Sequence, residues 1–177
     1  MRNTIETRRL LLISCDEEML RAVLSGDEVI AKLLNVNVAS PWTEAGEAAF
    51  KFSLDKISSY PEDRKWWTYL PVLKEENILI GSGGYKGKPD ADGMVEFGYE
   101  IAGAYRNRGL ATEMARGLIE HAFENPEVKI VRAHTLAEEN ASVKVLRKCG
   151  LDFIEEILDP EDGKIWSWEI IRSFQSK

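Results

Sequence analysis

The sequence has few cysteines, no long apolar run and no excess of cationic residues. Its two cysteines, Cys15 and Cys149, lie far apart and lack neighbours at ligand-like spacing, so we expect neither a disulfide framework nor a zinc site, and no bound metal. The apolar run at residues 10–13 is far shorter than a signal-peptide core, and no run approaches the length that spans a bilayer. These absences predict a cytoplasmic protein without a membrane partner.

Acidic residues outnumber basic ones. The 177 residues include 30 Asp and Glu against 23 Lys and Arg, which gives a net charge of −7. Phosphate binding needs a cationic face, so this balance argues against a nucleic-acid partner, although it leaves room for a local basic pocket. A net negative charge favours a cationic substrate, but solubility alone is a sufficient explanation for it.

The composition is that of one folded unit. Hydrophobic residues make up 44% of the chain and charged residues 30%, as in an ordinary globular protein rather than a disordered one. A chain of this length can bury a sizeable core but is short for two domains. We therefore expect residues 1–177 to form a single domain.

The pattern of apolar residues predicts a mixed α/β protein. Residues 5–14 read as a strand, Asp16 as the N-cap of a helix, and residues 16–58 as helical pieces with breaks near Gly26 and Pro41. Six further strands and two further helices follow. The strands are residues 65–73, 77–87, 94–102, 129–136, 151–158 and 164–171, and the helices are residues 110–123 and 140–149, the second closed by Gly150.

Two features of this order suggest how the strands pair. The first two and the last two of the six strands are joined by turn-like segments and predict hairpins. The strands at residues 94–102 and 129–136 are joined by a helix and should run parallel. We expect a mixed, mostly antiparallel sheet flanked by helices.

The segment YRNRGLATEM, residues 105–114, lies between a strand and a helix. A glycine at the first turn of a helix lets the backbone approach a ligand, and the unpaired amides there attract anions. Arg106 and Arg108 add formal charge beside Gly109. The segment can therefore bind a diphosphate; the plainer alternative is that Gly109 only eases a turn between solvated arginines.

These residues resemble the GNAT superfamily of acetyl-coenzyme A-dependent N-acetyltransferases. The pyrophosphate loop of that superfamily reads Gln/Arg-x-x-Gly-x-Gly/Ala, and residues 106–111, RNRGLA, match each defined position. The resemblance continues through VEFGYEIAGAYRNRGLATEM and ENASVKVLRKCGLDF. The start at residues 7–12, TRRLLL, is similar to the branch that contains the ribosomal-protein-alanine N-acetyltransferases.

The resemblance implies a GNAT-like domain whose sheet of about seven strands contains a parallel pair that splays apart. The splay falls between residues 94–102 and 129–135, where the pantetheine arm of acetyl-CoA would lie against exposed strand backbone. Backbone groups near residues 101–103 would hold pantetheine, and amides of residues 106–112 would hold the pyrophosphate. The expected cofactor-binding residues are Ile101, Ala102, Gly103, Arg106, Asn107, Arg108, Gly109, Leu110, Ala111 and Thr112, together with Asn140.

Asn140 and Ser142 begin the second short helix, where the superfamily often places an asparagine and a small polar residue near the thiol. Counted back from Gly150, however, the usual asparagine position holds Glu139. Asn140 is therefore either a cofactor contact or simply the N-cap of its helix.

The resemblance also implies a catalytic base on the strand before the loop. Glu96 and Glu100 are the available carboxylates, and strand alternation places both on one side, so periodicity cannot separate them. Glu96 matches the position where some members carry a base. Many relatives use a tyrosine in the second short helix as the acid, but Leu146 and Arg147 stand there, so Ser142 or solvent would have to protonate the thiolate.

Two further questions concern the role of His134 and whether the glycine-rich segments bind a nucleotide. His134 lies in a predicted strand, and it either reaches the substrate cleft or fills a structural place. Neither Gly87-Lys88 nor Gly163-Lys164 is followed by Ser or Thr, which excludes a phosphate-binding loop of the NTPase kind. GSGGYKG at residues 81–87 lacks the third glycine of a dinucleotide fingerprint.

The expected activity is acetyl transfer from acetyl-CoA to a primary amine, with Glu96 and Ser142 as candidate catalytic residues. The acceptor is expected to be a protein N-terminal amine or a small molecule such as an aminoglycoside, a polyamine or an amino acid. An acyl-CoA-binding sensor without turnover is the alternative from another class. Relatives of this size are often monomers or homodimers.

Overall fold

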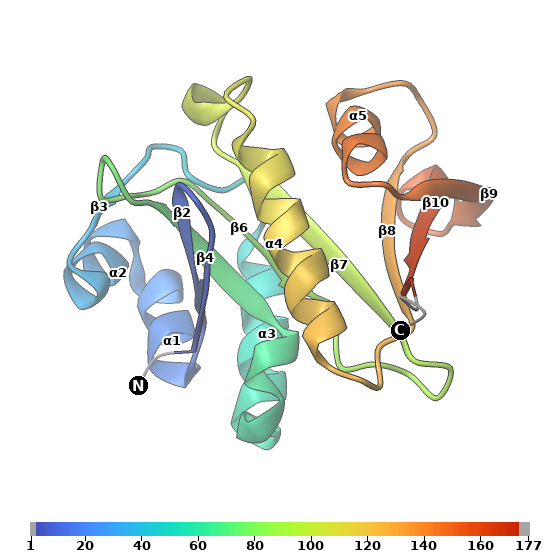
Figure 1. Ribbon diagram of the computed structural model, residues 1–177. Coiled ribbons are helices and arrows are strands. Elements are labelled where there is room, and N and C mark those ends of the chain that lie inside the picture. Colours follow the sequence, from blue (N-terminus) through green and yellow to red (C-terminus); the bar gives the residue numbers. More distant parts are fainter. Residues whose placement is uncertain (1–2, 174–177) are drawn as a thin grey trace.

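The computed structural model describes residues 3–173 (Figure 1). Its α-helices are α1 (Glu17–Ser25), α2 (Asp27–Leu34), α3 (Glu47–Ser59), α4 (Leu110–Glu124) and α5 (Ala141–Lys148), and its 3-10 helices are η1 (Pro61–Trp66) and η2 (Gly103–Tyr105). Its strands are β1 (Thr4–Glu6), β2 (Leu10–Ser14), β3 (Asn37–Val38), β4 (Thr68–Leu73), β5 (Ile78–Leu79), β6 (Gly81–Tyr85), β7 (Met94–Ile101), β8 (Ile130–Leu136), β9 (Asp152–Asp159) and β10 (Gly163–Ile171).

Within the described range, the strands form one ten-stranded sheet. Its order is β1-β2-β4-β6-β7-β8-β10-β9, and β3 and β5 pair beside β4. The pairs β3–β5 and β7–β8 are parallel and the other pairs are antiparallel. The expected mixed, mostly antiparallel sheet with helices around it is confirmed.

The expected number of about seven strands was too low because two predicted strands are divided and β3 was not foreseen. Residues 5–14 contain a turn, in which the Thr7 hydroxyl accepts a hydrogen bond from the Leu10 amide, so β1 folds back on β2. Residues 77–87 divide into β5 and β6 opposite Pro71, which has no N–H to donate to a neighbouring strand. The predicted strand at residues 65–73 starts only at Thr68, because η1 precedes it.

The helices cover both faces of the sheet (Figure 1). On one face α4 packs against β7, β1 and β2, and residues such as Leu10, Phe97 and Met114 form its core. On the other face α1, α2 and α3 enclose a second core that includes Ile30 and Leu70. The strands therefore bury alternate residues on opposite faces.

Several local predictions are confirmed. The Asp16 carboxylate accepts a hydrogen bond from the Met19 amide at 2.9 Å and caps α1. Gly150, with φ at +86°, follows α5 in the left-handed conformation that glycine tolerates. In the turn between β9 and β10, the Asp159 carboxylate accepts hydrogen bonds from two backbone amides.

None of the helices in the described part of the chain is both long and apolar enough to cross a membrane.

Candidate active site

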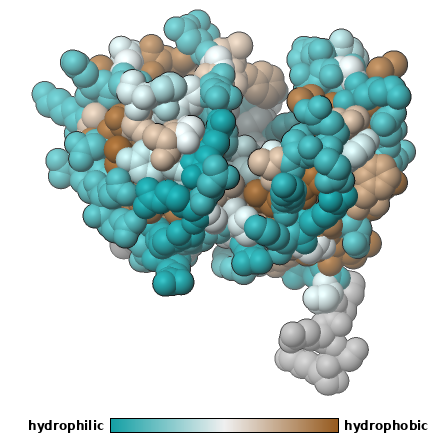
Figure 2. Space-filling model, turned by 90° about the horizontal axis from the view of Figure 1, so that it is seen from above, coloured by the Kyte–Doolittle hydropathy of each residue, from teal (hydrophilic) through white to brown (hydrophobic). Residues whose placement is uncertain are grey.

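The parallel strands β7 and β8 pair along only part of their length. The residues of β7 from Met94 to Glu96 pair with those of β8 from Ile130 to Arg132, and beyond these pairs the two strands are no longer hydrogen-bonded partners. Figure 1 shows them meeting near the C-terminal end of the described chain and diverging towards α5 and the loop before α4. Seen from above in Figure 2, the surface is hollowed between two lobes. We call this opening the strand gap.

Strand β7 directs alternate backbone groups into the strand gap. The Ala102 amide donates to Ile80 at 2.7 Å, and the Glu96 carbonyl accepts from the Lys86 amide at 2.9 Å. Even-numbered residues therefore face β6, and odd-numbered ones such as Ile101 face the gap. The Ile101 carbonyl accepts a hydrogen bond from Nε of Arg106. Of the neighbouring residues Ile101 and Ala102, only Ile101 can present its amide to a ligand in the gap.

The loop before α4 lies at one end of the gap (Figure 1) and contains two residues in the left-handed conformation. Asn107 and Gly109 have φ values of +60° and +75°, in the left-handed region. Helix α4 then starts at Leu110, and its first amides, from Leu110 to Thr112, have no carbonyl acceptor within the helix. Such an N-terminus binds anions through amides and the helix dipole.

Carboxylates hold both arginines of this loop. Arg106 pairs with Glu44 at 3.1 Å, while Arg108 lies close to both Glu75 and Glu76, at 3.1 and 3.2 Å. These pairs are exposed, so each contributes little energy. The positive charge beside the helix N-terminus is nevertheless partly neutralised, and the unpaired backbone amides are the groups there that suit an anion.

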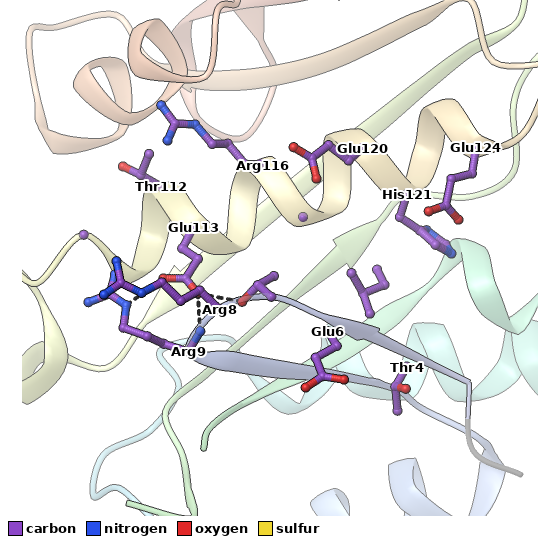
Figure 3. Close-up of a pocket in the computed structure, with 14 residues that line it drawn as sticks. Thr4, Glu6, Arg8, Arg9, Thr112, Glu113, Arg116, Glu120, His121 and Glu124 are labelled. Carbon is purple, nitrogen blue, oxygen red and sulfur yellow. Dashed lines mark hydrogen bonds and ion pairs between the residues drawn. The ribbon is translucent and has the colours of Figure 1, made fainter. Parts of the chain in front are cut away.

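The N-terminal hairpin is attached to the first turn of α4. Glu113 accepts hydrogen bonds from the Thr7 hydroxyl at 2.7 Å and from the Arg9 amide and Nε at 2.6 and 2.7 Å. Arg9 also donates from Nη1 to the carbonyl of Arg108 at 2.8 Å. Figure 3 shows Arg9 and Glu113 close together beside a cavity of about 560 Å³ between the hairpin and α4, which Thr7 also lines. We call Thr7, Arg9 and Glu113 the hairpin clasp; the sequence had not indicated it.

A second cavity, of about 550 Å³, opens where β7 and β8 separate, on the face away from α4. Strand alternation places Val95 and Phe97 in the core under α4 and Glu96 on the opposite face. We call this the acceptor cavity. Its polar lining includes Glu96, His134, Asn140 and Ser142, with Lys86 and Asp159 at its edge. Three of the predicted site residues, Glu96, Asn140 and Ser142, are thus brought to one cavity.

Glu96 is a half-buried carboxylate in a cationic setting. Its Oε1 atom lies 2.9 Å from Nδ1 of His134 and also accepts a hydrogen bond from the Lys86 ammonium. Burial by itself raises the pKa of Glu96, but the hydrogen bonds and charges of Lys86 and His134 outweigh burial and lower it. Glu96 is therefore ionised at neutral pH.

Glu100 has a different environment, although it shares a strand face with Glu96. It accepts hydrogen bonds from the hydroxyls of Thr43 and Ser82, and from the amide of Glu44 at 3.0 Å. Both of its oxygens are used, and it fixes the loop before α3. Because Glu100 is held by these hydrogen bonds, Glu96 is the carboxylate of β7 that lines the acceptor cavity.

The start of α5 carries Asn140 and Ser142. The Asn140 carboxamide oxygen accepts a hydrogen bond from the Val143 amide at 3.0 Å, so this side chain caps α5. Glu139, in the position where an asparagine was expected, is exposed and pairs with Arg147 at 2.7 Å. Leu146 is buried, and Ser142 remains at the cavity wall.

A tyrosine hydroxyl lies behind Ser142. Among residues 3–173, the Tyr99 oxygen is buried without a hydrogen-bond partner. Burial raises the pKa of Tyr99, and the nearby Ser142 hydroxyl partly offsets the rise. The sequence predicted the acid in α5 rather than at Tyr99 of β7, because only the tertiary structure brings Tyr99 close to Ser142.

His134 and Lys86 were also not predicted to meet Glu96. They come from separate elements, and no periodicity in the sequence relates one to the other. His134 had been recognised as a residue that reaches either the cleft or the core, and the structure places it at the acceptor cavity. Residues 3–173 contain no group of three His, Cys, Asp or Glu side chains suited to a metal ion.

Comparison of the sequence with known proteins identifies an acetyltransferase family. Residues 9–152 match the model of the acetyltransferase (GNAT) domain. The uncharacterized N-acetyltransferase YjdG of Bacillus subtilis is 26% identical over 147 residues, which are 82% of this chain and 88% of YjdG.

Two solved structures share the fold at low identity. The ribosomal-protein-S5-alanine acetyltransferase of Vibrio fischeri superposes with a TM-score of 0.71 at 15% identity, over 96% of each chain. An acetyl transferase of Salmonella typhimurium, which modifies the N-terminal serine of ribosomal protein L7/L12, superposes with a TM-score of 0.70 at 14% identity, over 97% of this chain and all of the other (100%).

Proposed function

The chain belongs to the GNAT acetyltransferase family, whose members depend on acetyl-CoA, and on this premise we propose that it acetylates a primary amine bound in the acceptor cavity, preferably the N-terminal amine of a protein. The observation that carries this proposal is that β7 and β8 stop pairing beside a cavity lined by Glu96, His134 and Ser142. The acetyl thioester at the end of a pantetheine arm in the strand gap and an amine in the acceptor cavity can meet at that point.

The residues around the gap suit acetyl-CoA. The amides at the start of α4, from Leu110 to Thr112, can bind its diphosphate, and the inward-facing backbone of Ile101 can pair with the amides of pantetheine. Gly109 leaves space there, since a Cβ atom would have only one neighbour, Nη2 of Arg9 at 3.5 Å. These groups bind and orient the thioester, and they supply no chemistry of their own.

The charge of the acceptor cavity supports an amine as the second substrate. Asp159 and Asp162, in the turn after β9, line the cavity together with Glu96. The pKa of Asp159 is lowered mainly by hydrogen bonds from the amides of Asp162 and Glu161, so its charge is present at neutral pH. Carboxylates at the entrance favour a cation over an anion.

A protein N-terminus is the easier acceptor chemically. At pH 7, removing the proton from an α-amine of pKa 7.7–8.0 costs about 1–1.4 kcal/mol, whereas a lysine amine of pKa 10.4 costs about 4.6 kcal/mol. The amine must lose this proton before it attacks the thioester. The Salmonella typhimurium enzyme with this fold modifies the N-terminal serine of a ribosomal protein, and the Vibrio fischeri enzyme is named for an alanine of ribosomal protein S5, which supports the preference.

Ser142 is the hydroxyl best placed to serve the departing thiolate. It lies at the start of α5 on the cavity wall, and Tyr99 lies behind it. Tyr99, whose raised pKa keeps it protonated, can replace a proton passed from Ser142 to sulfur once its unpaired hydroxyl turns to form a hydrogen bond with Ser142. Solvent entering the open cavity is the other source of this proton.

The proposal is tested by measuring coenzyme A release with a panel of acceptors. Peptides that begin with Ser or Ala are compared with spermidine, an aminoglycoside and free amino acids. We expect the highest kcat/KM with a peptide. Robust turnover of a small amine without any response to peptides would assign a small-molecule acceptor instead, and acetyl-CoA binding without thiol release from any acceptor would assign a sensor.

A further inference from the structure

Three polar side chains meet on the face of β7 and β8 that looks away from α4. Glu96 belongs to β7, His134 to β8, and Lys86 follows β6, so the tertiary structure alone brings them together. Nδ1 of His134 lies 2.9 Å from Oε1 of Glu96, the same oxygen that accepts from Lys86. All three side chains line the acceptor cavity.

The contact with Glu96 decides which ring nitrogen of His134 carries the proton. Glu96 is ionised, and an ionised carboxylate can only accept hydrogen bonds. The shared proton therefore belongs to Nδ1, and Nε2 of the neutral ring carries the lone pair. Within residues 3–173, Nε2 makes no hydrogen bond, and the His134 side chain is 20% exposed.

We propose that His134 accepts the proton of the acceptor amine at Nε2, and that Glu96 is a positioning residue that orients the ring and stabilises its charged form. The proposal rests on the proposed acetylation of an amine. A base is most effective when its proton affinity lies near the working pH, and imidazoles as a class meet this condition better than carboxylates do. The neighbours that lower the pKa of Glu96 weaken it further as a base.

An ammonium acceptor gives up two protons in the reaction. The first passes from its nitrogen to Nε2 of His134 and from there to water. The free amine attacks the thioester carbon, a C–N bond forms and the C–S bond breaks, and the second proton reaches the departing thiolate through Ser142 or solvent.

The charged groups around His134 should affect its protonation in opposite directions. Glu96 faces it from β7, Lys86 from the end of β6, and Asp159 from the end of β9, with Asp162 on the same cavity wall. Arg132, on the same face of β8, is paired with Glu169 of β10. Removal of an anion should disfavour protonated His134, and removal of the Lys86 cation should favour it.

The test compares four variants in the coenzyme A release assay, with a peptide that begins with Ala and with spermidine. We expect H134Q to lower kcat/KM for the acceptor by about 10²-fold, to abolish the acidic limb of the pH profile, and to change KM for acetyl-CoA by less than about threefold. E96Q should move this limb to lower pH and K86M to higher pH. H121Q is the control, because His121 is the only other histidine and lies beside Tyr85, on the α4 side of the sheet.

A second measurement needs no turnover. The chain has two histidines, so ¹⁵N imidazole shifts of the wild type and H121Q assign His134, and the proposal expects the Nδ1–H tautomer above the pH of the acidic limb. An Nε2–H tautomer, or an H134Q variant with near-normal kcat/KM and an intact limb, would overturn it. If the wild type releases no coenzyme A with either acceptor, the proposed acetylation fails, and the role of His134 as its base fails with it.

Discussion

Glu113 and Arg9 form two hydrogen bonds with each other across a sequence separation of 104 residues, one from the Arg9 amide and one from its Nε. Arg9 also donates to the carbonyl of Arg108, in the loop that precedes α4. The hairpin clasp therefore fixes the helix N-terminus and the loop beside it at once. The backbone geometry proposed to bind the diphosphate depends on this distant contact.

We expect Glu113→Ala to lower the free energy of unfolding by about 2 kcal/mol, because it leaves the partly buried Arg9 amide and Thr7 hydroxyl without their acceptor. For a chain of this size, this corresponds to a fall in Tm of roughly 4–8 °C. It should also raise KM for acetyl-CoA more than it lowers kcat. Glu120→Ala is the matched control, since Glu120 is exposed on the same helix. Equal melting temperatures for the two variants would contradict a structural role for the clasp.

The contribution of Glu113 should depend on pH with a definite sign. Burial raises its pKa, but hydrogen bonds from Thr7 and Arg9 outweigh burial, so its folded pKa lies below the ordinary value. The stabilisation is thus present above the unfolded pKa of about 4.3 and is lost as pH falls through the folded pKa. In urea unfolding, the free energy of unfolding of the wild type should exceed that of Glu113→Ala by a constant amount from pH 6 to 8. This excess should shrink below about pH 4. A difference that grows in acid would show the opposite linkage.

Gly109→Ala should weaken acetyl-CoA binding more than Arg108→Ala does. Gly109 has a φ of +75°, where an alanine costs roughly 1–2 kcal/mol, so the loop would relax away from its anion-binding shape. Arg108 already pairs with Glu75 and Glu76, and its loss should change the Kd only a few-fold. Calorimetric titration with coenzyme A distinguishes the two variants. Gly46→Ala, at a helix N-cap with a φ of −71°, controls for the substitution itself.

Gly98→Val probes the acceptor side of β7. Gly98 lies between Glu96 and Glu100 on one strand face, and a Cβ atom there would meet nothing within 4 Å. The new side chain should be tolerated by the fold and should project over the proposed acceptor site. We expect KM for the amine to rise about tenfold or more while KM for acetyl-CoA is unchanged. A rise in KM for acetyl-CoA alone would place the acceptor on the other face.

Tyr99→Phe and Tyr85→Phe form a matched pair for stability. The Tyr85 hydroxyl donates to the Leu118 carbonyl at 2.6 Å, whereas the Tyr99 hydroxyl is buried without a partner in residues 3–173. Removing a satisfied hydroxyl should cost about 1 kcal/mol, and removing an unsatisfied one should cost nothing or add about 1 kcal/mol. Thermal unfolding measures both. A large loss of stability in Tyr99→Phe would reveal a partner such as an ordered water.

The order of most elements and the position of the glycine turn before α4 could be predicted from the sequence alone. These features depend on local signals: Asp16 caps its own helix, Gly109 adopts its own backbone angle, and apolar residues repeat along α4. The parallel strands were foreseen because a helix joins them, and their separation was foreseen through the resemblance to GNAT enzymes. The caps, the turn and the apolar repeat depend on interactions within a few residues of the chain, whereas the separation of β7 and β8 was expected only from the resemblance.

The tertiary structure alone decided what each polar side chain touches. Glu96 and Glu100 share a strand face and are equivalent by periodicity, yet Glu100 contacts the loop before α3 and Glu96 contacts His134. Tyr99 lies near Ser142, and Arg9 reaches Glu113, through contacts between residues distant in sequence. The register between strands and the packing of helices on them depend on the whole core, so no short stretch of sequence encodes these contacts.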